Sequence, residues 1–238
     1  MPTIQTVTLS LFRFATLSGR LWALGQMGAA RLAFSRMPEA RFWKLCGSGT
    51  GEGFTPRPNT AVWAILAAWD DEATARRMTA AAPVFRRWRA RAAEDWTVFL
   101  APVQARGRWS GVEPFAPSGR PVAGPLAALT RATIRPSVLL RFWGRVPDIS
   151  AVIGQDRNVV FKIGIGEVPW LHQVTFSIWP DAAAMAAFAR GDGPHGRAIR
   201  AVREEGWFRE ELYARFAILG DAGTWQGGRP LERIAPAS

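Results

Sequence analysis

An internal repeat constrains the fold of this chain more than any other feature of its 238 residues. Residues 13–44 align with residues 131–162 without a gap, and this places Lys44 on Lys162. Beyond the lysines the match continues with small gaps. Tryptophans recur in it at three places: Trp69/Trp179, Trp96/Trp207 and Trp109/Trp225. The constant order and spacing favour a duplication over chance, so both copies are expected to fold alike.

Hydrophobic periodicity predicts the order β-α-β-β-α-β in each copy. In the first copy, strands are expected at 3–14, 41–46, 60–69 and 97–109, and helices at 18–34 and, interrupted near Pro83, at 70–96. In the second copy, strands are expected at 126–134, 158–167, 171–179 and 213–225, and helices at 136–153 and 181–206. Ser18 is the expected N-cap of the first helix, whose apolar stripe is Leu21, Leu24, Gly28 and Leu32.

This pattern indicates the α+β class, as two tandem ferredoxin-like units. A single unit leaves one sheet face bare, so two units can press these faces together into a barrel-like sandwich, as in the dimeric α/β-barrel proteins. The expected parts are a first repeat over 1–112, a Pro/Gly-rich linker over 113–125, a second repeat over 126–227 and a tail over 228–238.

The charge balance is strongly basic, with 30 Lys and Arg against 19 Asp and Glu and a net charge of +11. Nucleic acid, anionic membranes and acidic proteins are the partners that such a charge attracts. The arginines are spread along the chain without a block of like charges, which favours a solvated basic surface. The spaced aromatics of RNA-recognition strands are absent around Lys162, so nucleic acid is not an expected partner.

Cysteine count and apolar run length exclude several other classes. The single cysteine, Cys46, excludes an intramolecular disulfide and a metal site built from cysteines. The longest apolar run, residues 61–69, is far shorter than the roughly 18 residues of a membrane-spanning helix. The first residues show no signal-peptide pattern. These features favour a protein of a reducing compartment that is soluble or peripheral to a membrane.

Few residues can carry chemistry. Two histidines and one cysteine offer no defensible Ser-His-Asp or Cys-His arrangement. The glycine-rich stretch 47–53 resembles a phosphate-binding loop, but a strand rather than a helix follows it, so an inter-strand loop is favoured.

His195 is the strongest candidate. It follows Pro194 at the start of a predicted helix and shares a face with Ala198, Ile199 and Val202. An imidazole on this inward stripe needs a hydrogen bond, a metal or a haem iron, whereas a first-turn histidine can also reach solvent. His172 is the second candidate because it shares a strand face with apolar residues. Cys46 is a third, although a lone strand cysteine is more often an apolar core residue.

The tryptophans divide into two groups. Those that recur in both copies are expected in the core. Four others have no match in the other copy and are freer to line a pocket: Trp22, Trp63, Trp143 and Trp170.

Four segments of the sequence are long and distinctive: RFWKLCGSGTGEGFTP at 41–56, RFWGRVP at 141–147, FKIGIGEVP at 161–169 and HQVTFSIWPD at 172–181. They resemble the spheroidene monooxygenase family, the acyclic carotenoid ketolases of purple photosynthetic bacteria. The resemblance extends from Thr6 to about Gly227.

The resemblance implies a haem-dependent monooxygenase that oxidises C-2 of spheroidene and related carotenoids twice, with loss of water to leave a ketone. It further implies O₂, a reduced ferredoxin as electron donor, and a cytoplasmic enzyme that meets its substrate at the photosynthetic membrane. Haem proteins of the dimeric α/β-barrel type suggest, by analogy of fold, His195 as iron ligand, with His172 next and Lys162 or nearby arginines beside the propionates. A haem or carotenoid carrier without catalytic activity is the alternative.

Overall fold

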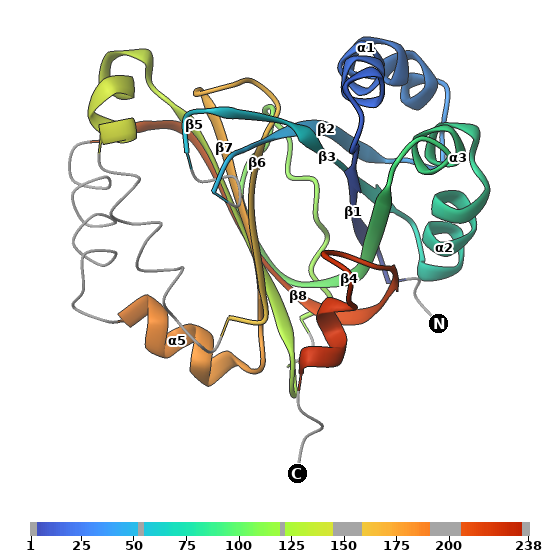
Figure 1. Ribbon diagram of the computed structural model, residues 1–238. Helices are drawn as coiled ribbons and strands as arrows, with labels where there is room; N and C mark the ends of the chain where they lie inside the picture. Colours follow the sequence, from blue (N-terminus) through green and yellow to red (C-terminus); the bar gives the residue numbers. More distant parts are fainter. Residues whose placement is uncertain (1–3, 52–54, 120–121, 145–158, 191–205, 235–238) are drawn as a thin grey trace.

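Eight antiparallel strands form a closed barrel in the part of the chain that the structure describes (Figure 1). The structure is a computed structural model, and it describes residues 4–51, 55–119, 122–144, 159–190 and 206–234. Around the barrel the strands follow the order β1-β3-β2-β6-β7-β5-β8-β4. Their bounds are Thr6–Arg13 (β1), Phe42–Gly49 (β2), Pro58–Trp69 (β3), Glu94–Gly107 (β4), Leu126–Ile134 (β5), Phe161–Gly166 (β6), His172–Trp179 (β7) and Phe208–Gly223 (β8).

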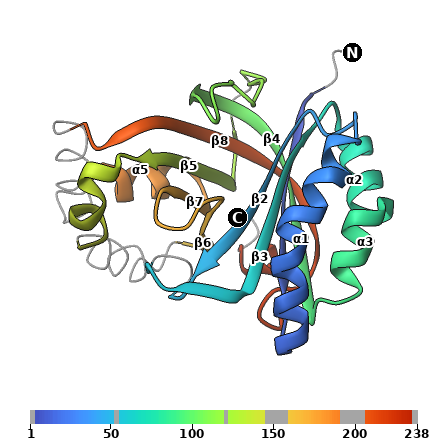
Figure 2. The ribbon, with the colours of Figure 1, turned by 90° about the horizontal axis from the view of Figure 1, so that it is seen from above.

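Helices pack on the outside of the barrel. Figure 2 shows three of them beside the strands of the first half: α1 (Leu17–Ser35), α2 (Glu72–Ala81) and α3 (Pro83–Arg89). Asp71 caps α2 by accepting a hydrogen bond from the Thr74 amide, and Pro83 begins α3. In the second half, α5 (Ala182–Arg190) follows β7, and short 3₁₀ turns lie at Pro136–Val138 and Pro230–Arg233. None of the described helices has the length and apolarity that crossing a bilayer requires.

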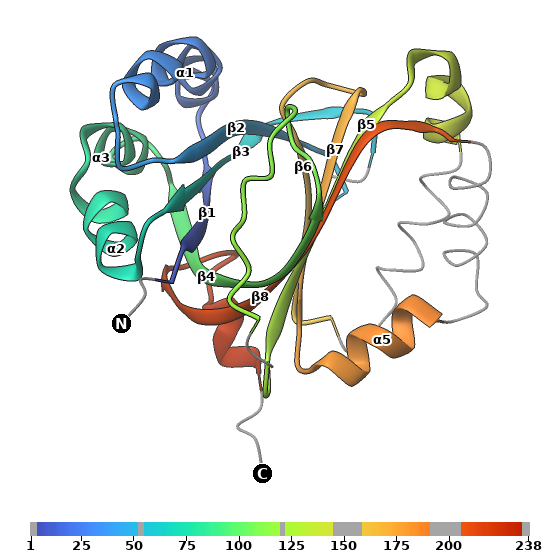
Figure 3. The ribbon, with the colours of Figure 1, turned by 180° about the vertical axis from the view of Figure 1, so that it is seen from behind.

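The two halves of the chain contribute two arcs of one barrel. The first arc has the order β4-β1-β3-β2 and the second has the equivalent order β8-β5-β7-β6. The arcs join at their edges, through a long β4–β8 pairing and a short β2–β6 pairing (Figure 3). The expected mixture of helices and strands is confirmed, and the two sheets enclose one shared interior as a closed barrel. The ferredoxin-like repeat stays a prediction, because segments 145–158 and 191–205 lie outside the described residues.

Strand alternation divides the apolar residues between two cores. On β1, Val7, Leu9 and Leu11 point into the barrel and are fully buried. Phe12 points outward, and its ring lies 5.2 Å from that of Trp88 on α3. The barrel interior and the layer between first-half strands and helices therefore form separate apolar cores.

The strand registers correct the sequence alignment at the lysines. Ala68 of β3 pairs with Phe42, and the equivalent Ile178 of β7 pairs with Phe161. Phe42 and Phe161 are therefore equivalent positions in the two halves. It follows that Lys44 is equivalent to Ile163 and not to Lys162. Because a shift of one residue reverses the face of every side chain, Lys44 points into the barrel and Lys162 away from it. The alignment is right at Trp69 and Trp179, whose neighbours Ala68 and Ile178 are equivalent.

Helix α1 is present where the sequence predicted it, but its cap and its buried face differ. Thr16, not Ser18, caps the helix by accepting a hydrogen bond from the Gly19 amide at 3.1 Å. Small residues and one phenylalanine form the buried face: Gly19, Ala23, Ala30 and Phe34. The predicted leucine stripe faces solvent, with Leu21 at 61% and Leu24 and Leu32 at 55% exposure. Small side chains allow the helix to approach the sheet closely, so the larger leucines remain outside.

Replacement of Gly223 is expected to destabilise the barrel closure. Its φ is +87°, and a Cβ there would lie 2.2 Å from the Asp95 carbonyl oxygen on β4. Gly223→Ala should lower the free energy of unfolding by about 2 kcal/mol or more, through left-handed strain and this clash. Gly25→Ala in α1, where a Cβ meets nothing within 4 Å, should stabilise by roughly 0.5–1 kcal/mol. Urea denaturation of both variants measures this, and equal stabilities would contradict it.

Candidate functional site

The outer faces of the two arcs, on the side away from the barrel interior, differ sharply in side-chain size. In the first half this face is filled by large apolar residues that pack against α1, α2 and α3 in one continuous core. These residues are Phe12, Trp43, Leu45, Trp63, Ile65 and Phe99. The first half therefore uses its outer face for stability.

Strand registers identify the second-half residues at the same six positions, and all six are small or polar. They are Ala132, Lys162, Gly164, Gln173, Thr175 and Arg215, in the same order. We call these six residues the second-half outer face. Two small apolar clusters lie at its ends, one around Trp207 and one around Trp179.

This composition suits a large ligand better than a protein core. Four of the six residues are smaller than their first-half counterparts, while Lys162 and Arg215 are long and charged. Ala132 is only 9% exposed, so this part of the face is covered rather than open to solvent. Lys162 and Arg215 add positive charge at two strands of the face. An apolar body with anionic groups at its edge would match these residues.

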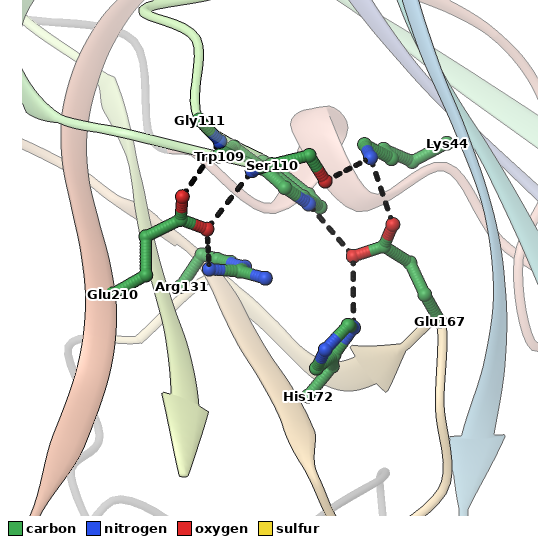
Figure 4. A network of polar contacts seen from close by, with 8 residues as sticks. All are labelled: Lys44, Trp109, Ser110, Gly111, Arg131, Glu167, His172 and Glu210. Carbon is green, nitrogen blue, oxygen red and sulfur yellow. Dashed lines mark hydrogen bonds and ion pairs between the residues drawn. The ribbon is translucent and has the colours of Figure 1, made fainter. Parts of the chain in front are cut away.

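A cluster of charged side chains at one end of the barrel interior is the second candidate (Figure 4). Glu167, just after β6, receives three contacts. Lys44 Nζ lies 2.9 Å from its Oε1, while the Trp109 indole nitrogen and His172 Nδ1 lie 2.7 Å and 3.3 Å from its Oε2. Lys44 also donates to Ser110 Oγ at 2.6 Å. We call Lys44, Trp109, Glu167 and His172 the barrel-end cluster.

A tight turn after β4 carries Trp109 into this position. Ser110 and Gly111 have φ of 56° and 79°, which is typical of a type I′ turn. Glu210 of β8 holds the turn by accepting hydrogen bonds from both backbone amides, at 2.9 and 2.7 Å, and pairs with the buried Arg131. Burial opposes ionisation of Glu210, but these amides and Arg131 outweigh it and lower its pKa.

The opposite end of the barrel shows which of these features the fold needs. There Trp225 and Glu94 repeat Trp109 and Glu210, and the Gly227 amide donates to Glu94 at 2.8 Å. The other positions carry no charge: Ile163 replaces Lys44, Ser48 replaces Glu167, Val62 replaces His172 and Leu11 replaces Arg131. The opposite barrel end therefore closes without charged residues at these four positions. This indicates that Lys44, Glu167, His172 and Arg131 serve a purpose other than closing the barrel.

Electrostatics keep Glu167 ionised. Burial alone would raise the pKa of this carboxyl group, but contacts from His172, Lys44 and Trp109 outweigh it and lower the pKa to about 2. A carboxylate that stays charged above this pH is a poor proton donor or acceptor near neutrality. Its role is to fix its neighbours: it ties the β6–β7 turn to β2 and to the turn after β4.

The structure places the predicted site residues as follows. His172 lies at the start of β7 with Nδ1 toward Glu167, the arrangement by which carboxylates orient histidine ligands of metals. Cys46 is fully buried inside the barrel, where burial raises the pKa of its thiol far above the usual range. Cys46 therefore does not fit a thiolate ligand. His195 lies outside the described residues. Of the glycine-rich stretch, residues 47–49 belong to β2 and residues 50 and 51 follow it, while residues 52 and 53 lie outside the described residues.

Sequence reasoning missed Glu167, Arg131 and Glu210. A signal for Lys44 was present, since it alternates with Phe42 and Cys46 on one strand face. Glu167 and Arg131 come from distant strands, so only the barrel register brings them together. Among the described residues, no group of three or more histidine, cysteine or acidic side chains forms a metal site.

Curated relatives are similar to this chain over most of its length. No family model matches it. The spheroidene monooxygenase of Rhodobacter capsulatus is 59% identical, over 96% of both chains, and that of Cereibacter sphaeroides is 58% identical, over 96% of this chain and 71% of the relative. The spheroidene monooxygenase of Rubrivivax gelatinosus is 38% identical, over 89% of this chain and 82% of the relative.

Solved structures are similar in fold. An aldoxime dehydratase aligns with a TM-score of 0.64 and 13% identity, over 98% of this chain and 89% of the other. An aldoxime dehydratase in complex with butyraldoxime aligns with a TM-score of 0.61 and 12% identity, over 91% of this chain and 80% of the other. At these identities the likeness shows the fold alone.

Glu167→Gln is expected to weaken the protein at neutral pH and much less in acid. The native carboxylate has its pKa lowered from 4.5 to about 2, so its stabilisation is complete above pH 4.5 and is lost as the pH falls toward 2. The variant should lose about 2–3 kcal/mol of unfolding free energy at pH 7, partly because Lys44 stays buried without its partner. Urea denaturation between pH 7 and 3 measures this. A difference that stays constant with pH would contradict it.

Proposed function

The chain belongs to the spheroidene monooxygenase family, and on this premise we propose that it oxidises acyclic carotenoids at C-2. Two successive hydroxylations would place two hydroxyl groups on one carbon, and loss of water would leave a ketone. Each hydroxylation uses one O₂ and two electrons with two protons, inserts one oxygen atom into a C–H bond and releases the other as water. A reduced ferredoxin is the proposed electron donor, and the net charge of +11 suits an acidic partner of this kind.

The contrast between the two outer faces is the single observation that carries the proposal. Family membership supplies a long apolar substrate, and the second-half outer face has small or polar residues where the first half has six large apolar side chains. Trp207, Phe142 and Ile134 at one end and Trp179, Leu126 and Met185 at the other supply apolar contacts. A polyene would lie along such a surface, with its reacting end held at a fixed place.

Haem is the proposed cofactor, because oxidation of an unactivated C–H bond needs an activated oxygen species that side chains alone cannot supply and that haem iron can. The residue types of the second-half outer face suit this group: a flat ring would pack against the small residues Ala132 and Gly164, and Lys162 and Arg215 are cations suited to its propionates. His195 remains the proposed iron ligand. His172 is the alternative, with Glu167 orienting its ring.

We further propose that the two arcs are duplicated ferredoxin-like units. Their equivalent strand orders support this, as do the tryptophan turns that close both ends of the barrel. After the duplication, the first half would have kept large apolar side chains on its outer face. The second half would have replaced them with small or polar residues that bind a ligand.

Histidine variants test the cofactor and its ligand. The chain produced with a haem supply should show a Soret absorption band, and His195→Ala should lose or shift it while His172→Ala keeps it. Loss of the band in His172→Ala alone would move the ligand to the start of β7. Absence of haem from every preparation would overturn the cofactor. A Soret band without an oxidised product from spheroidene, O₂ and a reductant would favour a haem or carotenoid carrier without catalytic activity.

Restoring first-half bulk tests the place of binding. Ala132→Phe installs the residue found at the equivalent position, Phe12, and should reduce haem and carotenoid binding at least tenfold because the ring occupies the ligand's space. Ala132→Ser at the same position adds little volume and should retain binding. Absorption titration measures both, with far-ultraviolet circular dichroism as the folding control. Undiminished binding by a folded Ala132→Phe would place the ligand elsewhere.

A further inference from the structure

The exposed face of α1 carries a stripe of leucines. Leu17, Leu21, Leu24 and Leu32 are 72%, 61%, 55% and 55% exposed, and at about 100° per residue they lie within about 80° of one another. Figure 2 shows α1 on the outside of the molecule, beside α3. A contiguous apolar stripe on a helix surface indicates an interaction site more strongly than scattered exposed leucines do.

Arginines flank the stripe on both sides. Arg20 and Arg31 lie along one edge of α1, where they donate hydrogen bonds to backbone carbonyls. Across the other edge, Arg87 and Arg91 belong to α3 and the residues just after it. None of the four forms an ion pair with any described residue. Neither α1 nor α3 contains an acidic residue, so this face is basic as well as apolar.

A cleft of about 410 Å³ separates the stripe from α3. Its walls include Trp22, Ala29, Ala33 and Val84, with Arg87 and Arg91 on the α3 side. The guanidinium of Arg91 lies 4.9 Å from the centre of a Trp22 ring. Trp22 thus lines a pocket, as its lack of a repeat counterpart predicted. Apolar walls beside cations suit an acyl chain with an anionic headgroup.

We propose that the leucine stripe of α1, the arginines on either side and the α1–α3 cleft form a docking surface for an anionic lipid bilayer. A bilayer supplies hydrocarbon for the leucines and negative headgroups for the arginines in one partner. An acidic protein would match the arginines but not the leucines. A second copy of the chain, placed face to face, would bring two basic surfaces together. Only the use of this surface, to reach a substrate dissolved in membrane, rests on the proposed function.

Vesicle flotation of the full chain tests the surface. Vesicles of phosphatidylcholine and phosphatidylglycerol at 3:1 should carry the protein upward at low salt, whereas pure phosphatidylcholine or 0.5 M NaCl should reduce binding strongly. The double variant Leu21→Ser/Leu24→Ser should bind at least about tenfold more weakly than the original chain. The double variant Arg20→Gln/Arg31→Gln should show a loss of the same size. Leu140→Ser, at a leucine that is 90% exposed in the second half, should float like the original chain.

Three results would overturn this proposal. They are no flotation with anionic vesicles, equal loss with Leu140→Ser, and light scattering that shows a dimer which Leu21→Ser/Leu24→Ser converts to a monomer. The last result would mean that a second copy covers the stripe. Flotation needs no turnover, so a chain that floats but does not oxidise carotenoids would overturn only the proposed function.

Discussion

Closure of the barrel through β4–β8 and β2–β6 is the constraint on which the rest of the structure depends. Once those edges pair, every strand residue points either into the shared interior or toward the outside, and a slip of one residue would exchange the two sets. Gly107 and Gly223 mark this closure. Both have positive φ, and a Cβ at either would lie 2.2 Å from a carbonyl oxygen of the paired strand. At both barrel ends the backbones of β4 and β8 therefore lie closer together than any residue with a Cβ would allow.

A shared interior core makes the barrel less dependent on its outer faces. Both arcs contribute buried residues to this one core, whatever side chains their outer faces carry. Large aromatic residues and three helices make the first half a rigid support. The second half has Ala132, Gly164 and Thr175 where that support has Phe12, Leu45 and Ile65. Binding sites built on a rigid scaffold hold their ligands more precisely, which is how such a division of labour would serve catalysis.

Sequence periodicity predicted most strands because alternation and turn residues are local signals. It failed where a property depends on register or on close packing. Lys44 and Lys162 look equivalent in sequence, yet β2 and β6 place them on opposite faces. The leucines of α1 look like a core stripe, yet the sheet accepts the side with Gly19 and Ala23. Likewise, no local pattern joins Lys44 to Glu167, since their contact exists only because β2 and β6 are neighbours across the two halves.

The barrel-end cluster links the interior to the second-half outer face. Burying Lys44 and Glu167 of this cluster costs desolvation energy that the opposite end avoids with Ile163 and Ser48. The contacts of Glu167 fix both ends of the β6–β7 turn, because Glu167 precedes it and His172 begins β7. Gln173 and Thr175 follow at once on the outer face. A charged cluster whose partners have fixed directions sets the position of β7 more precisely than apolar packing can, and the lining of the proposed site depends on that position.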